Sequence, residues 1–236
     1  MSTSLSILTI LGTTAAIGLA VSPLPTIRTI WSSKSVGEFS AFPYIVTFCQ
    51  ASLWITYSLV TPGKAGLIPV NVIIASLELG YVIIFLVYTG RRYREELITT
   101  ILYVVGATIA AIFISFLTNS PSGFVGFFAV ISNIIMYAAP LGVVKTVIET
   151  KSVEYMPFLL SLAGTISALI WVLWAVVARD PFVFLPNVLG VILGIIQLAV
   201  YKKYRKETSV VVSPDTVMLA TLEAGSDASN QQKQLR

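Results

Sequence analysis

The sequence has few charges, no histidine and a single cysteine. Only 11% of its 236 residues are charged and 56% are hydrophobic, whereas about 25% of the residues in an average soluble domain are charged. Without histidine the chain lacks the usual proton-relay side chain. Cys49 alone excludes an internal disulfide. A chain of this composition is expected in a membrane rather than in water.

Long runs without charge predict membrane-spanning helices. A charge at bilayer depth costs about 2.5–3.5 kcal/mol, and a helix of about 20 residues crosses the ~30 Å hydrocarbon core. One run is twice that length, but the turn cluster TNSPSG (Thr118–Gly123) divides it. Seven helices are predicted, in the charge-free runs Ser2–Ile27, Phe39–Gly63, Ala65–Gly90 (interrupted by Glu78), Leu97–Val144 (the divided run), Tyr155–Ala178 and Pro181–Tyr201.

The basic residues predict the orientation, because cytoplasmic loops are enriched in Lys and Arg. With the N-terminus outside and the C-terminus in the cytoplasm, only Lys64 and Arg179 of the 15 basic residues lie outside. The polar segment 207–236 is expected to be a disordered cytoplasmic tail. The sequence favours the plasma membrane, with the vacuole or another internal membrane left open.

One motif occurs twice. PLPTIRTIWSSKSV (Pro23–Val36) and PLGVVKTVIETKSV (Pro140–Val153) are 117 positions apart. The same register, with small slips further along the chain, aligns several other residues. The aligned pairs are Trp54 with Trp171, Tyr57 with Trp174, Pro43 with Pro157, and Asn71 with Asn187. The chain is therefore predicted to be a duplicated three-helix unit.

Both copies carry basic residues in their first loop, so both must insert the same way up. A three-helix unit ends on the opposite side from its start, and one more crossing must intervene. We therefore predict an all-α membrane protein of two parallel three-helix repeats joined by one linker helix (3+1+3). The expected parts are a first repeat (1–90), an inner loop with the linker helix (91–122), a second repeat (123–206) and the tail.

Several segments resemble the SWEET family of eukaryotic sugar facilitators, in order and in spacing. They are SPLPT, FPYI, LWITYS, YAAPL, YMPFLLSLAG and RDPFVFLPNVLGVILGIIQLAVY. The resemblance covers about residues 5–205. It implies a bidirectional uniporter for mono- or disaccharides of the glucose or sucrose class that works by alternating access, often as a homo-oligomer.

Four prolines lie near the cytoplasmic ends of the first two helices of each repeat. They are Pro23, Pro43, Pro140 and Pro157. A proline inside a helix removes one backbone hydrogen bond and kinks the helix, although prolines are also ordinary punctuation in membrane helices. The resemblance matches these four to the proline tetrad that acts as inner hinge and gate, and we favour the hinge.

Asn71 and Asn187 are amides within apolar helices and need hydrogen-bond partners. Each either bonds a neighbouring helix or faces a central cavity, where it would bind sugar hydroxyls. Trp54 and Trp171 are either packing residues or flat surfaces for a sugar ring. Repeat symmetry and the resemblance favour a substrate site formed by all four residues.

The resemblance also implies an outer gate made by Tyr57 and Asp180, against the alternative that Asp180 is an exposed acid balancing Arg179. Leu19 and Met136, each one turn before a repeat proline, are candidates for setting selectivity. Glu78 is the only acid within a span, and a role in proton coupling is one interpretation of it. It has no acidic mate in the second repeat, so we interpret it as structural.

Two other classes remain as alternatives. A proton-coupled amino-acid carrier of the PQ-loop type is disfavoured because Pro-Gln dipeptides are absent. A seven-helix receptor is disfavoured because receptors do not usually contain a parallel duplication. No phosphate-binding loop supports ATP-driven transport. We expect no enzyme activity, no cofactor, no metal and no nucleic-acid partner, with the lipid bilayer as the surrounding medium.

Overall fold

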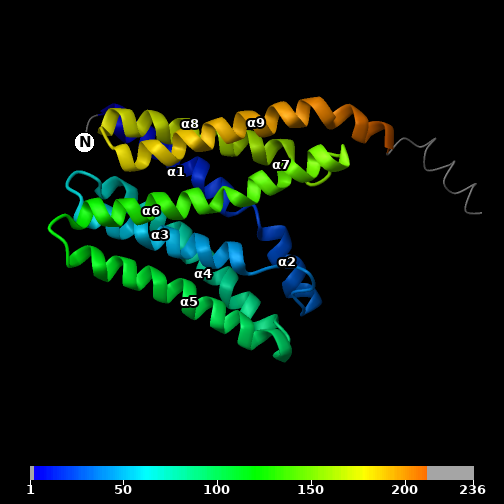
Figure 1. Cartoon of the computed structure of the whole chain (residues 1–236), viewed down its shortest axis with the longest axis horizontal. Helices are drawn as coiled ribbons and strands as arrows, with labels where there is room; N and C mark the ends of the chain where they lie inside the picture. The colour runs from blue at the N-terminus through cyan, green and yellow to red at the C-terminus, as the bar shows by residue number, and fades with distance from the viewer. Residues whose placement is uncertain (1–2, 212–236) are drawn as a thin grey trace, which may run out of the picture.

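The computed structural model describes residues 3–211, which are helical apart from short connections. The long helices run side by side along one direction (Figure 1). The elements are α1 (Thr3–Ala20), α2 (Leu24–Ser33), α3 (Phe42–Val60), the 3₁₀ turn η1 (Ala65–Leu67), α4 (Ile68–Tyr88), α5 (Arg91–Phe116), α6 (Pro121–Met136), α7 (Ala138–Thr150), α8 (Phe158–Ala178) and α9 (Pro181–Val211). The predicted all-α fold with seven spans is confirmed, with α1–α2 and α6–α7 each forming one interrupted span.

Two of the four candidate hinge prolines lie at these interruptions. After α1 ends at Ala20, the backbone N–H of Leu24 donates to the carbonyl of Val21 at 3.0 Å, and Pro23 precedes α2. In the second repeat the break falls at Tyr137, and Pro140 occupies the first turn of α7. A proline is tolerated in a first turn because the N–H that it lacks would have no helical partner there.

The other two prolines begin helices instead of bending them. Pro43 is the second residue of α3, and Pro157 immediately precedes α8. Neither of these two prolines kinks a helix interior, and their role in the inner gate stays a prediction. Only Pro23 and Pro140 accompany a break within a span.

Within the described part of the chain, six segments are long and apolar enough to cross a membrane. The span outside this set is α3, which has 19 residues. Its apolar character is diluted by polar side chains such as Thr47, Gln50 and Thr56. Two of these, Thr47 and Gln50, line the cavity described below, so the weaker hydropathy of α3 has a structural reason.

The two repeats pack against each other in equivalent ways. The first helix of each repeat lies along the second helix of the other, α1 against α8 and α3 against α6. Within each repeat, α3 packs on α4 as α8 packs on α9. Close approach of α9 to α8 uses Gly194, where an added Cβ would collide with Thr165, and Gly190, where it would lie 3.3 Å from Cβ of Ala168 and collide with the hydroxyl of Tyr137 at 2.8 Å. The linker helix α5 lies outside the bundle against α3, α4 and α6 (Figure 1).

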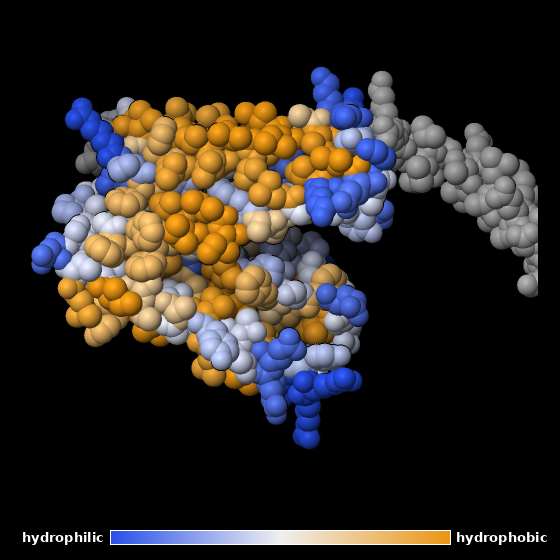
Figure 2. Space-filling model, in the orientation of Figure 1, coloured by the Kyte–Doolittle hydropathy of each residue, from blue (hydrophilic) through white to orange (hydrophobic). Residues whose placement is uncertain are grey.

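Basic residues gather at one end of the bundle, which we call the basic end: they lie on α2 and just after it, at the start of α5, on α7 and just after it, and in the last part of α9. Figure 2 shows an apolar belt between the two ends. This end carries the tips of α2, α4, α7 and α9, and Figure 2 shows a hollow between α2 and α7 there. Helix α9 continues to Val211 and so includes residues 207–211 of the expected tail. Residues 212–236 lie outside the described part.

Candidate functional site

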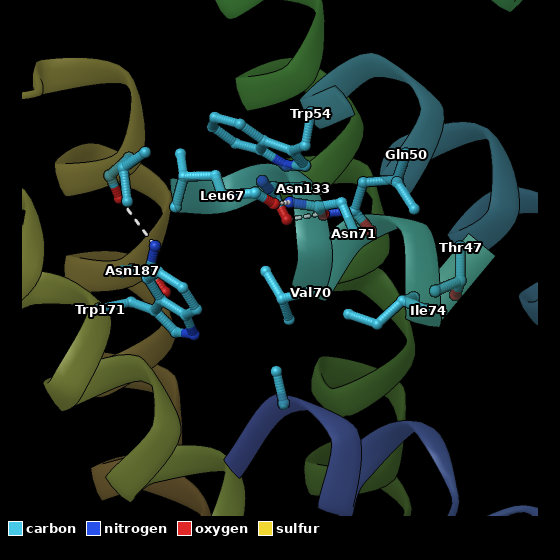
Figure 3. A pocket seen from close by; sticks show the side chains of 13 residues that line it. Thr47, Gln50, Trp54, Leu67, Val70, Asn71, Ile74, Asn133, Trp171 and Asn187 are labelled. Atoms are coloured by element: carbon cyan, nitrogen blue, oxygen red, sulfur yellow. Dashed lines mark hydrogen bonds between the residues drawn. The ribbon is translucent and has the colours of Figure 1, made fainter. Parts of the chain in front are cut away.

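A cavity of about 180 Å³ lies between the two repeats, midway along the bundle. It is lined by residues from α1, α3, η1, α4, α6, α8 and α9, whereas α5 contributes none. None of the lining side chains is charged. The polar groups are the side chains of Thr47, Gln50, Asn71, Asn133 and Asn187, and the largest apolar surfaces are the indoles of Trp54 and Trp171 (Figure 3).

The two predicted asparagines occupy equivalent places in this cavity. Asn71 donates from Nδ2 to the carbonyl of Leu67 at 2.8 Å, and Asn187 donates from Nδ2 to the carbonyl of Val183 at 2.7 Å. Each amide is thereby fixed by the backbone carbonyl four residues before it in the chain. The amide oxygens remain as acceptors beside the cavity.

The two predicted tryptophans also line the cavity, on different helices. Trp54 on α3 packs edge-to-face against Tyr57, and Trp171 on α8 packs edge-to-face against Trp174. The backbone of α1 touches Trp171 at Gly12, where an added Cβ would lie 2.9 Å from Cε2 of the indole. These contacts hold each indole in place at the cavity.

A polar pair that the sequence reasoning missed crosses the cavity wall. Gln50 on α3 donates from Nε2 to Oδ1 of Asn133 on α6, and both residues line the cavity. The repeat register gave no signal for them, because Asn133 corresponds to Ala16 and Gln50 corresponds to Ser167. Helical spacing contains one signal, since Gln50 lies one turn before Trp54 and therefore on the same face.

Beyond the cavity, away from the basic end, a buried polar network closes the bundle. Tyr57 donates its hydroxyl to both carboxylate oxygens of Asp180 at 3.0 Å, and both residues are 2% exposed. Asp180 also accepts the N–H groups of Phe182 and Val183 at 3.1 Å, so it caps the start of α9. The predicted pair of Tyr57 and Asp180 is thus in direct contact, and Asp180 is not an exposed acid. We call this end of the bundle the closed end.

Lys64 completes the network, and the sequence reasoning missed it. Its ammonium lies 2.9 Å from Asp180 Oδ2 and donates to the carbonyl of Ala178 at 2.9 Å. It also lies 5.3 Å from the centre of the Trp174 ring, whose Nε1 donates to Thr9 on α1. The network therefore joins α1, α3, α8 and the connections before α4 and α9.

Three residues that the sequence analysis considers do not line the cavity. Leu19 and Met136 are not among its lining residues. Glu78 is 4% exposed, and its Oε2 has no hydrogen-bond partner in the described part of the chain. Among residues 3–211 no cluster of three or more Cys, Asp or Glu side chains could hold a metal ion.

This arrangement suits an uncharged ligand with many hydroxyl groups. Amide side chains donate and accept hydrogen bonds, and indole faces cover apolar surface. A fixed amide in each repeat and an indole on each of two helices would surround such a ligand from several sides.

Comparisons with known proteins point to the same chemistry. A family model described as "Sugar efflux transporter for intercellular exchange" matches residues 6–93 and 123–209. Bidirectional sugar transporter SWEET5 of Arabidopsis thaliana is 37% identical over 213 residues, covering 88% of this chain and 89% of the relative. SWEET2 of the same plant is 38% identical over 205 residues, covering 84% and 86%. The solved structure of a eukaryotic SWEET transporter superposes with a TM-score of 0.81 at 33% identity, covering 86% of this chain and 97% of that one.

Proposed function

Because this chain belongs to the SWEET family of sugar transporters, we propose that it is a membrane protein that carries sugars across a bilayer in both directions. The cavity between the repeats is the proposed sugar site. The single observation that carries this proposal is the repeat-related pair of fixed amides, Asn71 and Asn187, in a cavity without charged side chains. Sugar hydroxyls would donate to the amide oxygens, and the indoles of Trp54 and Trp171 would cover the ring.

The proposed mechanism is alternating access. The Tyr57–Asp180–Lys64 network keeps the closed end shut, and the hollow between α2 and α7 at the basic end would be the route to the cavity (Figure 2). In the other state the network would separate and α2 and α7 would meet at the basic end. The breaks at Pro23 and Pro140 supply the bending points, while Pro43 and Pro157 fix where α3 and α8 begin.

The orientation places the basic end in the cytoplasm, following the distribution of Lys and Arg. The closed end then forms the outer gate. Carriage is proposed to be downhill and independent of protons, since the cavity contains no titratable side chain.

The first test measures uptake of labelled glucose and labelled sucrose into liposomes that contain the purified protein, with and without a proton gradient. We expect one of these sugars, or both, to equilibrate without the gradient. Uptake of neither sugar would overturn the proposal, and accumulation only under the gradient would revive a coupled carrier in which Glu78 takes part.

The second test ties the activity to the cavity. Asn71→Ala and Asn187→Ala should each abolish sugar flux while the protein still inserts into the membrane. Ser76→Ala is the matched control on α4, because Ser76 is exposed and only bonds the carbonyl of Val72. Normal flux in either asparagine variant would remove that residue from the site.

A further inference from the structure

The duplicated motif ends in Lys-Ser-Val in both repeats, and the sugar site does not explain why. Lys34 follows the last residue of α2, and Lys151 follows the last residue of α7. Both lysines have a left-handed backbone, with φ of 56°. This conformation is uncommon outside glycine, asparagine and aspartate. A repeated lysine at a strained position suggests that its side chain has a specific task.

Lys34 contacts Tyr88, the last residue of α4. Its ammonium lies 3.0 Å from the hydroxyl of Tyr88 and 5.0 Å from the centre of that ring. It also lies 4.8 Å from the centre of the Trp31 ring, and the two aromatic rings meet edge-to-face. The lysine therefore joins the tip of α2 to the tip of α4 through cation–π and hydrogen-bond contacts.

Lys151 makes the equivalent contact in the second repeat. Its ammonium lies 3.3 Å from the hydroxyl of Tyr204 and 4.8 Å from the centre of that ring. Tyr204 lies on α9 and is 5% exposed. The one-residue gap that aligns Asn71 with Asn187 also aligns Tyr88 with Tyr204. The same lysine–tyrosine contact therefore occurs in both copies.

The serine and valine of the motif support this geometry. Ser35 accepts the N–H of Gly37 at 3.2 Å, and Ser152 accepts the N–H of Glu154 at 3.3 Å, so each serine shapes the turn that follows the lysine. Val36 packs against the apolar cluster that contains Ile30 and Phe85. Val153 packs against the cluster that contains Val147, Met156 and Tyr204.

Topology alone does not require these contacts. Arg28 and Lys145 are basic residues of the same two helices and contribute equally to a basic end. Lys145 is 76% exposed in its side chain and only approaches Glu149 at 3.8 Å. A charge that merely orients the chain needs neither an aromatic partner nor a left-handed backbone.

We propose that the Lys34–Tyr88 and Lys151–Tyr204 contacts, here called the lysine clasps, fasten α2 to α4 and α7 to α9, so that each pair moves as one unit during transport. This inference rests on the proposed function. The lysines are positioning residues and do not touch the sugar. The breaks after α1 and α6 free α2 and α7 to swing, and the clasps attach each swinging helix to the last helix of its repeat.

A double-mutant cycle tests the first clasp. Lys34→Met and Tyr88→Leu should each lower the maximal rate of sugar exchange about two- to fivefold and leave the half-saturation concentration unchanged. The double variant should be no slower than the single variants. Tyr88→Phe keeps the ring and should lose less, and Lys145→Met should transport like the natural sequence. Additive losses, or an effect on half-saturation alone, would overturn the proposal.

Crosslinking provides a sharper test. Cysteines replace Lys34 and Tyr88 in a Cys49→Ala background, and a flexible bismaleimide joins them. A covalent clasp should restore the rate that the uncrosslinked variant has lost. If crosslinking stops transport, or leaves it slow, then α2 and α4 do not move as one unit and the proposal is wrong.

A matched crosslink shows that the method detects a blocked gate. Ser33→Cys with Thr150→Cys, at the exposed tips of α2 and α7, should halt transport once joined. Thermal unfolding of the Lys34 and Tyr88 variants gives a readout without sugar, and non-additive shifts are expected there as well. If the natural sequence moves no sugar while the unfolding shifts are non-additive, the proposed function fails and the contact stands. Transport with additive unfolding shifts would overturn the clasp.

Discussion

Replacing Asp180 with asparagine should open the closed end. The carboxylate has four partners, namely the Tyr57 hydroxyl, the Lys64 ammonium and two backbone N–H groups. The side chain of Asp180 is 0% exposed and that of Lys64 is 11% exposed. Asp180→Asn keeps the shape but leaves Lys64 without a counter-charge, and breaking a buried pair costs about 3–5 kcal/mol.

This cost falls on one state only. When the closed end opens, Lys64 and Tyr57 become hydrated and no longer need the carboxylate. A loss of about 3 kcal/mol in the closed form therefore shifts the equilibrium between the two states roughly 100-fold toward the open form. Net sugar flux should fall, because the protein returns less often to the form described here.

Thiol accessibility measures this shift directly. Val70 lines the cavity and is 2% exposed, so Val70→Cys in a Cys49→Ala background reports on water entering from the closed end. An impermeant maleimide applied at that side should react roughly 100-fold faster when Asp180→Asn is added. Arg179→Asn is the control, because it removes a neighbouring exposed charge and tolerates the left-handed backbone at that position. An unchanged labelling rate in Asp180→Asn would refute the reasoning.

Three further sets of variants test the packing in and around the cavity. Gly12→Val places a side chain against the Trp171 indole, so it should lower the free energy of unfolding by about 1–3 kcal/mol and raise the half-saturation concentration for sugar. Gly18→Val is the control on the same helix: an added Cβ there meets no atom within 4 Å, so this variant should transport normally. Gln50→Ala and Asn133→Ala should each lower the free energy of unfolding by about 1–3 kcal/mol, because each leaves the other amide unpaired. The double variant should lose less than the sum of the two single losses. Additive shifts of the unfolding temperature would show that the two amides act separately. Tyr137→Phe removes the hydroxyl that donates to the carbonyl of Pro186 at 2.5 Å, and it should lower the free energy of unfolding by about 1 kcal/mol. The control in thermal unfolding is Tyr103→Phe, at an exposed tyrosine on α5. An equal shift in both variants would argue against a role for this hydrogen bond.

The sequence predicted those residues of the site that occur at equivalent positions in both repeats. Asn71 and Asn187 share one register, as do Trp54 and Trp171, and all four line the cavity. The polar pair of Gln50 and Asn133 was not predicted, because the residues at equivalent positions in the other repeat, Ser167 and Ala16, do not carry amide side chains. Lys64 escaped for a related reason, because a single basic residue in a short loop looks like ordinary solvent-facing charge until the fold brings Asp180 beside it.

Helix breaks were less predictable than helix positions. Hydropathy identified the spans, since lipid contact imposes one chemical character on long stretches of chain. It does not record where backbone hydrogen bonding changes partner, and so the interruptions at residues 21–23 and at Tyr137 were not located. Proline alone was a poor guide, because Pro43 and Pro157 occupy helix starts where their missing N–H has no cost.

Helix α5 makes the two sides of the bundle unlike. It covers the seam between α3 and α6, while the equivalent seam between α1 and α8 carries no such helix in the described part of the chain. The two repeats already pack against each other through α1 with α8 and α3 with α6. The main role of α5 is therefore to return the chain to the side of the membrane on which the second repeat begins, and it adds less to the packing between the repeats. A chain divided in the turn at 118–120 and expressed as two separate polypeptides should therefore reassemble. Groups of apolar residues of α5 should also tolerate replacement by other apolar residues.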